Sequence, residues 1–289
     1  MKPAPFDYVA PGCIEEALDQ LARAAGDATI LAGGQTLMPL MALRMSTPSV
    51  LVDINRIDAL KGVACEEGAL RIGAVVRQND LLADVRAAEA LPSLARAVGH
   101  IGHHQTRNRG TVGGSISLGE PAAELPAAAV ALGARIEVHS SRGVREIAAE
   151  DFYLGPYSTV LEPDELVTAI RFPTWPGHAV TIFREVARRP GDFALVGLVG
   201  SLVVEDKRIS RAGLAWFGMG PTPMKARQAE AALVGQTLAG LDLDNVARLA
   251  IADTAPFDDG HADAEYRRIV GARAFVRALS EALNVRRAA

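Results

Sequence analysis

The stretch LAGGQTLMPL, Leu31 to Leu40, restricts the possible folds of this chain more than any other. A short apolar run, Ala28 to Leu31, leads into Gly33 and Gly34, and an apolar segment with Pro39 follows. This order predicts a strand that ends in a tight turn, because glycine takes positive φ and allows close approach to the backbone. Consecutive N–H groups in such a turn can bind an anion such as phosphate. The spacing matches neither G-x-x-x-x-G-K-S/T nor G-x-G-x-x-G, which excludes both nucleotide-binding fingerprints.

A second glycine pair, in TVGGSIS from Thr111 to Ser117, also lies between β-branched and hydroxyl-bearing residues. A loop from Ile101 to Arg109 is expected to lead into it. Either pair alone is best explained as a structural turn. Two such turns from different parts of the chain could instead close on the two phosphates of one dinucleotide. The sequence therefore predicts two phosphate-binding glycine turns.

Composition limits the classes of function. The 289 residues are enough for two domains with their own cores. A formal net charge of −4 argues against nucleic acid as a partner, since that needs a basic face. No apolar run approaches the ~20 residues of a membrane span, and MKPAPFDY lacks the apolar stretch of a signal peptide, so a cytoplasmic location is expected. The only cysteines, Cys13 and Cys65, are too few for an iron–sulfur cluster or a four-cysteine zinc site.

Hydrophobic periodicity divides the chain into three units. The first unit, residues 1–57, is expected to hold a helix from Ile14 to Ala25, the strand with the first glycine turn, a helix-like segment from Leu37 to Leu43 and a strand in VLVDINRI. This order predicts a βαβ-like unit. The first glycine turn would then lie at the carboxyl end of a strand, where α/β sheets usually bind ligands.

The second unit, residues 58–176, is expected to contain strands at 70–75, 135–139 and 166–172, a helix at 80–94 interrupted at Pro92, and an alanine-rich helix at 122–132. TWPGH, Thr174 to His178, is the predicted boundary to the third unit. In that unit, residues 177–289, strands around Phe183, at 194–204 and at 212–217 predict an antiparallel sheet. Two helices, near 225–234 and 263–283, are expected to complete the chain.

These motifs resemble those of a known family. AGGQT and TVGGS look like the paired flavin-binding motifs of the FAD-binding (medium) subunits of molybdenum hydroxylases, of the carbon monoxide dehydrogenase, xanthine dehydrogenase and quinoline oxidoreductase type. The segments RNRGTVGGSIS, EPAAELPAAAVALGA, ARRPGDFA and AEYRR match in order, so the resemblance covers nearly the whole chain. It implies an α+β fold, with a two-subdomain FAD-binding domain of the vanillyl-alcohol-oxidase or PCMH-like kind followed by a C-terminal α+β domain.

The resemblance also implies which residues bind FAD, noncovalently. The glycine segments would cradle its pyrophosphate, and residues near Ile101 and Val167 would pack beside the isoalloxazine ring. Glu124 would meet the ribityl or adenosine side, with a solvated helix residue as the alternative. Phe193 would cover the flavin, with the first core residue of a strand as the alternative. The implied set is Ile30, Leu31, Ala32, Gly33, Gly34, Gln35, Thr36, Leu37, Ile101, Gly102, Thr111, Gly113, Gly114, Ser115, Glu124, Val167, Arg184, Asp192 and Phe193.

No catalytic side chain and no metal ligand is expected. The histidines at 100, 103 and 104 have no carboxylate or cysteine at ligand spacing nearby. A hydrolase triad built on Ser117 and Glu120 is excluded because the chain has no G-x-S-x-G turn. Arg107 and Arg109, which flank Asn108, could pair with phosphate or a partner chain, or lie in a solvated loop.

The resemblance implies the FAD-binding electron-transfer subunit of a heterotrimeric molybdenum hydroxylase. A large molybdopterin chain would oxidise the substrate, a small chain with 2Fe–2S clusters would relay electrons, and this chain would pass them through FAD to an external acceptor. A dimer of heterotrimers is expected. Two alternatives stay open, a self-contained flavin oxidase or reductase of the same fold and a non-catalytic scaffold. Since substrate would bind to the large chain, carbon monoxide, an N-heterocycle, a purine and an aldehyde all remain candidates.

Overall fold

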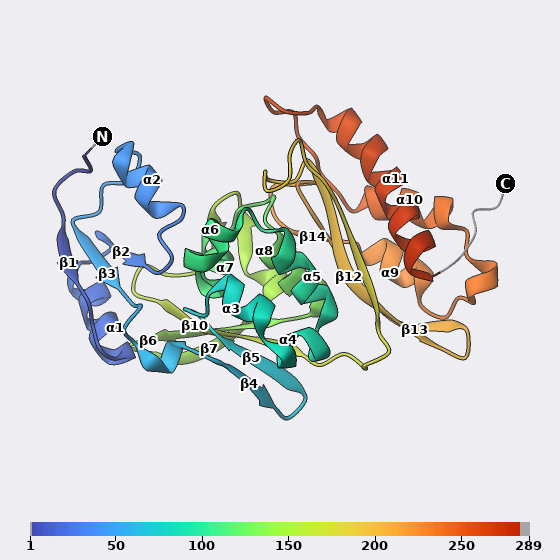
Figure 1. Ribbon diagram of the computed structural model, residues 1–289. Coiled ribbons are helices and arrows are strands. Elements are labelled where there is room, and N and C mark those ends of the chain that lie inside the picture. The colour runs from blue at the N-terminus through green and yellow to red at the C-terminus, as the bar shows by residue number, and fades with distance from the viewer. Residues whose placement is uncertain (1, 284–289) are drawn as a thin grey trace.

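The computed structural model describes residues 2–283, which form three units in a row (Figure 1). The first unit is a parallel sheet of β1 (Asp7–Val9), β3 (Val50–Asp53) and β2 (Ala28–Leu31), in that order. Helix α1 (Ile14–Arg23) buries its apolar face against this sheet, and α2 (Leu37–Ala42) connects β2 to β3. The predicted βαβ-like unit is therefore confirmed, and the first glycine turn lies at the carboxyl end of β2.

The second unit is built on an antiparallel sheet. Its strand order is β4 (Val63–Glu66), β5 (Ala69–Gly73), β10 (Leu166–Pro173), β6 (Arg135–Ser140) and β7 (Gly143–Ala148). The predicted strands correspond to β5, β6 and β10. The outer strands β4 and β7 were not expected, because VACE and GVREIA are short and mostly exposed, without the apolar alternation that marks a strand.

The helix expected over residues 80–94 is instead three helices, α3 (Gln78–Ala83), α4 (Val85–Ala90) and α5 (Pro92–His100). The Asp84 side chain accepts hydrogen bonds from the amides of Arg86 and Ala87, which starts α4. Pro92 begins α5 rather than interrupting a helix. Proline is suited to the first turn of a helix, because the N–H that it lacks would have no partner within the helix there.

Two further expectations of irregular structure were wrong. The segment expected as a loop contains α6 (His104–Arg109), and the second glycine pair lies in the first turn of α7 (Val112–Leu118). The next helix, α8 (Glu124–Leu132), is buried along its whole length because it packs between the second unit and the C-terminal sheet. A helix apolar on all sides is expected only in such a position.

The third unit is an antiparallel sheet of β11 (Val180–Val186), β12 (Val196–Glu205), β13 (Arg208–Phe217) and β14 (Met224–Lys225). The first three strands were predicted and the short β14 was not. One face contributes side chains to the core of the second unit. The other face is covered by three helices, α9 (Arg227–Leu233), α10 (Leu243–Ala252) and α11 (Ala264–Leu283), where two were expected. Helix α10 was missed although Asp242 caps it and its buried residues recur at helical spacing.

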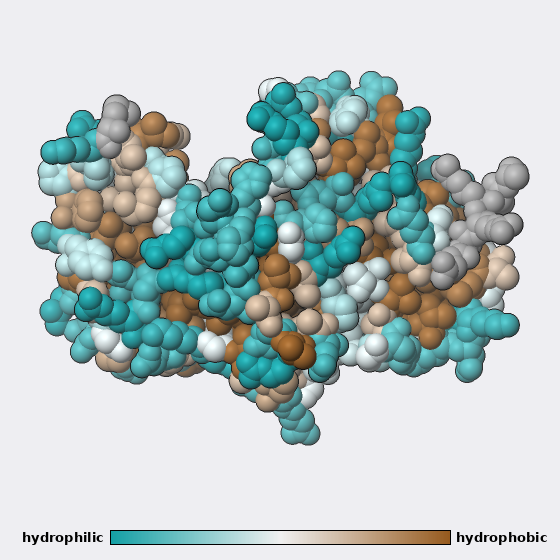
Figure 2. Space-filling view, in the orientation of Figure 1, coloured by the Kyte–Doolittle hydropathy of each residue, from teal (hydrophilic) through white to brown (hydrophobic). Residues whose placement is uncertain are grey.

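Shorter elements complete the described chain. These are the 3₁₀ turns η1 (Asp58–Leu60), η2 (Ala149–Asp151) and η3 (Leu238–Gly240), and the small hairpin of β8 (Tyr153–Gly155) and β9 (Ser158–Thr159). Within residues 2–283, no helix combines the length and the apolar character that crossing a membrane requires. Figure 2 shows the surface hollowed between the first unit, at left, and the remainder of the molecule.

Candidate cofactor-binding site

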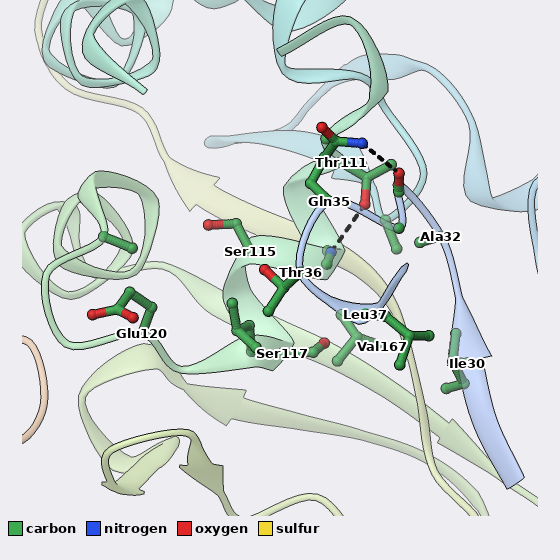
Figure 3. Close-up of a pocket in the computed structure, with 18 of the residues that line it drawn as sticks. Ile30, Ala32, Gln35, Thr36, Leu37, Thr111, Ser115, Ser117, Glu120 and Val167 are labelled. Atoms are coloured by element: carbon green, nitrogen blue, oxygen red, sulfur yellow. Dashed lines mark hydrogen bonds between the residues drawn. The ribbon is translucent and has the colours of Figure 1, made fainter. Parts of the chain in front are cut away.

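A cavity of about 400 Å³ lies between the first unit and the helices of the second. The first glycine turn and the start of α7 both line it, so the two glycine motifs meet at one cavity (Figure 3). Of the predicted cofactor residues, the following line the cavity: Ile30, Ala32, Gly33, Gly34, Gln35, Thr36, Leu37, Ile101, Thr111, Gly113, Gly114, Ser115, Glu124, Val167 and Phe193.

The first glycine turn presents free hydrogen-bond donors. Gly34 has a φ of +69°, which bends the chain from β2 into α2. Within the described part of the chain, no backbone amide from Gly33 to Thr36 donates a hydrogen bond. The Gln35 side chain donates from Nε2 to the Gly33 carbonyl at 3.1 Å and holds the turn closed. A row of unpaired amides at a cavity wall can donate hydrogen bonds to an anionic ligand such as a pyrophosphate.

The two glycine motifs approach each other very closely. A Cβ atom on Gly33 would lie 2.4 Å from the carbonyl oxygen of Arg109 and 2.9 Å from the Cα atom of Gly110. Both are backbone atoms, which cannot rotate away. Glycine at position 33 therefore lets the turn of the first unit pack directly on the backbone that leads into α7.

The amides of the second glycine pair already have acceptors within the protein. The amides of Val112 and Gly113 donate to the carbonyls of Val76 and Ala74, at 3.0 and 2.8 Å. The Gly114 amide donates to the Thr111 hydroxyl at 3.1 Å, which caps α7. These amides are therefore not free donors for a phosphate, because the packing of α7 on the segment after β5 uses them. What α7 offers the cavity is its positive end and the hydroxyls of residues such as Ser115.

Replacing Thr111 with valine should lower the free energy of unfolding by about 1 kcal/mol, the usual loss on removing a helix N-cap. The Thr111 hydroxyl is the acceptor for the Gly114 amide, and valine keeps the shape without it. Urea unfolding of the FAD-free chain measures the change. Thr111→Ser, which keeps the hydroxyl, should unfold at the wild-type urea concentration. Equal stability of the valine variant would show that the cap contributes nothing.

The remaining wall of the cavity is mainly apolar. Ile101 and Val167 belong to this wall, together with Leu37 and Leu118, and they can cover a flat aromatic ring. Phe193 also lines the cavity, yet 61% of its side chain is exposed. It is therefore not the buried first residue of a strand, and it lines the cavity with much of its surface exposed.

Glu124 is a buried acid at the cavity wall, only 5% exposed, so it is not a solvated helix residue. Burial is the main cause that raises the pKa of Glu124 to about 8. A hydrogen bond from its own backbone N–H lowers the pKa, and the charges of Glu185 and Glu120 raise it. Arg107 acts in the opposite direction. At neutral pH the Glu124 carboxyl is mostly protonated and can donate a hydrogen bond. Glu185, on β11, is similar, since burial raises its pKa to about 7.

Four predicted residues, Leu31, Gly102, Arg184 and Asp192, do not line the cavity. Arg184 lies on β11 and forms an ion pair with Glu281 of α11 at 3.6 Å, on the face away from the cavity. Asp192 pairs at 3.6 Å with Arg189 in the turn before Phe193. Gly102, with a φ of +44°, shapes the turn after α5.

Other lining residues were not predicted. They come from segments outside the glycine motifs and comprise Thr29, Leu40, Ile54, Ala74, Gln78, Thr106, Gly110, Ser117, Leu118, Glu120, Ala123, Leu161, Glu165 and Leu166. Among them, Gln78 offers a free acceptor, because its buried Oε1 atom has no hydrogen-bond partner among the described residues. No sequence signal marks these positions, since each depends on tertiary contact.

Arg107 and His100, which precede α7, have structural partners. Arg107 donates from Nη1 to the carbonyls of Ile101 and Gly102, at 2.8 and 3.2 Å, and so folds back on its own loop. His100 stacks on Phe183 of the C-terminal sheet with ring centroids 4.3 Å apart. Residues 2–283 contain no group of three or more histidine, cysteine or acidic side chains arranged for a metal ion.

Comparison with known proteins gives two family matches that together span most of the chain. Residues 4–175 match the FAD binding domain in molybdopterin dehydrogenase, and residues 181–282 match the CO dehydrogenase flavoprotein C-terminal domain.

Individual relatives agree with these matches. The 6-hydroxypseudooxynicotine dehydrogenase complex subunit alpha of Paenarthrobacter nicotinovorans is 36% identical, covering 98% of this chain and 96% of its own length. Caffeine dehydrogenase subunit beta of Pseudomonas sp. strain CBB1 is 37% identical, covering 98% of this chain and 97% of its own length. In a solved structure of carbon monoxide dehydrogenase from Hydrogenophaga pseudoflava, the matching chain is 35% identical with a TM-score of 0.95, covering 98% of this chain and 99% of that one.

Proposed function

Because the chain belongs to the family of FAD-binding flavoprotein subunits of molybdopterin dehydrogenases, we propose that it holds one noncovalent FAD in this cavity and passes electrons from a partner's 2Fe–2S clusters through it to an external acceptor. The observation that carries the proposal is the row of unpaired amides from Gly33 to Thr36. The same cavity continues into an apolar region, as a ligand with a pyrophosphate at one end and a flat ring at the other requires.

The residues of the chain bind and shield, and none needs to act as a catalytic acid or base. The amides from Gly33 to Thr36 would donate hydrogen bonds to the pyrophosphate, and the protonated Glu124 carboxyl would donate to a polar group of the cofactor. Ile101 and Val167 would cover the ring, and Phe193 would close the opening. Bound FAD supplies the redox chemistry, since flavins exchange electrons singly or in pairs.

We further propose that the partners are a large molybdopterin chain and a small iron–sulfur chain, in a dimer of heterotrimers. The two cysteines of this chain cannot hold an iron–sulfur cluster, so the electron donor would be another subunit. Three exposed apolar side chains lie on or next to α2, namely Met38, Leu43 and Met45. They support a protein partner at the first unit, where Figure 2 also shows an apolar patch at upper left.

Purification through a tag on this chain tests the proposed complex. Both partner chains should copurify, and substrate should bleach the flavin absorbance only when the iron–sulfur chain is present. Turnover of small substrates by the FAD-loaded chain alone would contradict this and favour a self-contained flavin enzyme. A chain that stays colourless in the assembled complex would favour a scaffold.

Replacing Phe193 with alanine should weaken FAD binding by roughly tenfold, because part of an aromatic side chain would no longer cover the apolar ligand. Quenching of the bound flavin's fluorescence by iodide should also become stronger. Tyr266→Ala provides a control, since Tyr266 is a similarly exposed aromatic on α11 that does not line the cavity. Unchanged affinity and quenching in the Phe193 variant would show that this side chain does not cover the cofactor.

A further inference from the structure

Behind the cavity, one hydrogen-bond network connects the two glycine motifs. It contains Asn55, which follows β3 in the first unit, and Arg77, which precedes α3 in the second. The network holds the Ala32 carbonyl, next to the first glycine pair, and the Arg109 carbonyl, before the second. Neither Asn55 nor Arg77 lines the FAD cavity.

Asn55 is fixed on the side of the first unit. Its Nδ2 atom donates to the Ala32 carbonyl at 2.9 Å and to the Asp53 carboxylate at 2.6 Å. The Asn55 backbone amide also donates to Asp53 at 2.9 Å, and the Tyr8 hydroxyl donates to the other carboxylate oxygen at 2.6 Å. The side-chain oxygen of Asn55 therefore has one orientation, in which it faces Arg77.

Arg77 joins the two units. Its Nη2 atom donates to the Asn55 side-chain oxygen at 2.6 Å, and its Nη1 atom donates to the Arg109 carbonyl. That carbonyl is the atom on which Gly33 packs, where a Cβ would lie only 2.4 Å away. Arg77 thus orients the peptide that sets the spacing between the first glycine turn and the start of α7.

The partners of Arg77 indicate a geometric role. Burial lowers its pKa and the nearby charge of Arg109 lowers it further, while Asp80 and Asp53 act in the opposite direction. Within the described part of the chain, however, no carboxylate lies within ion-pair distance of its guanidinium. The two Nη atoms of Arg77 donate to neutral oxygens on two different segments. Arg77 therefore acts through the rigid, planar shape of its guanidinium and not through an ion pair.

We propose that Arg77 and Asn55 are positioning residues for the FAD pyrophosphate: they hold the first glycine turn, with its free amides, at a fixed distance from the start of α7. This inference rests on the proposed function. The network would act through the backbone of Ala32 and Arg109, without touching the cofactor itself.

The test compares FAD affinity in Arg77→Leu with that in Arg86→Leu. Arg86 is the matched control, since among residues 2–283 it pairs with the nearby Asp84 alone, at the surface. FAD titrations followed by flavin fluorescence should show roughly tenfold or more weaker binding for Arg77→Leu, as expected for losing charge-assisted hydrogen bonds, and wild-type binding for Arg86→Leu. Arg77→Lys, which can replace one donor but not the fork, should lie between.

A double variant shows whether the two residues act together. Asn55→Ala should also weaken FAD binding, and adding it to Arg77→Leu should cost less than the sum of the separate losses, because both changes open one network. Thermal unfolding of the FAD-free variants separates positioning from general stability.

Lower FAD-free stability with unchanged FAD affinity, in the leucine or the lysine variant, would overturn the inference and leave the proposed function standing. If the leucine variant does not fold, the lysine and Asn55 variants decide. Failure of the wild-type chain to bind FAD, alone and in its complex, would overturn both.

Discussion

Replacing Gly33 with alanine should reduce FAD affinity by roughly a hundredfold, because the added methyl group would overlap the backbone between Arg109 and Gly110. The Cβ atom would lie 2.4 Å from the Arg109 carbonyl oxygen, far inside van der Waals contact. The chain can relieve the overlap only by moving the first glycine turn away from the start of α7. That movement displaces the unpaired amides from the positions where they would meet the pyrophosphate. Quenching of FAD fluorescence on titration measures the loss.

Gly177→Ala is the matched control for this change. Gly177 lies between β10 and β11, and among the described residues a Cβ atom there would have no neighbour within 4 Å. Its FAD affinity should equal that of the wild type. If Gly33→Ala also binds FAD as tightly as the wild type, the two glycine motifs do not enclose the cofactor in the way described.

Replacing Glu124 with glutamine should stabilise the FAD-free chain at alkaline pH. The folded Glu124 has a pKa of about 8, mainly because of burial, whereas the carboxyl of an unfolded chain ionises near 4.5. Between these values the folded chain keeps a proton that the unfolded chain releases, so stability falls as pH rises from about 4.5 to about 8. Glutamine removes this contribution. The gain over the wild type should reach the order of 5 kcal/mol above pH ~8 and vanish below pH ~4.5.

Chemical unfolding of both proteins across this pH range measures the difference. The same change at Glu67, which is exposed in the turn between β4 and β5, is the matched control. A constant difference between Glu124→Gln and wild type at every pH would show that Glu124 does not take up a proton on folding.

The local parts of the site could be predicted from the sequence. The strand, the glycine pair and the apolar segment from Ala28 to Leu40 determine a βα turn whatever surrounds them, and the structure has this turn. The resemblance to flavin-binding subunits placed a second motif at Thr111 to Ser117, and both motifs line one cavity. What local pattern could not decide is whether Gly113 and Gly114 form a turn or the first turn of a helix. Contacts with Ala74 and Val76, distant in sequence, decide it for the helix.

The sequence could not show which side chains of β11 face the cavity, because this depends on tertiary contacts. Neighbouring residues of a strand point to opposite faces, so either Phe183 or Arg184 could face the cofactor domain. In the structure Phe183 stacks on His100, and Arg184 turns to α11. No sequence motif marks Arg77 or Gln78. Their contacts with Asn55 and Gly110 join segments that are far apart in the sequence, so only the folded structure shows them.

Titration of the purified chain with FAD, followed by absorbance and acid precipitation, tests the central claim most directly. The account predicts saturable binding of one FAD per chain, full release of the flavin into the supernatant by acid, and much weaker binding by Gly33→Ala. Flavin that remains attached to the acid-precipitated protein would contradict noncovalent binding. Absence of FAD binding, both by the chain alone and within its purified complex, would contradict the account of the cavity as a flavin site.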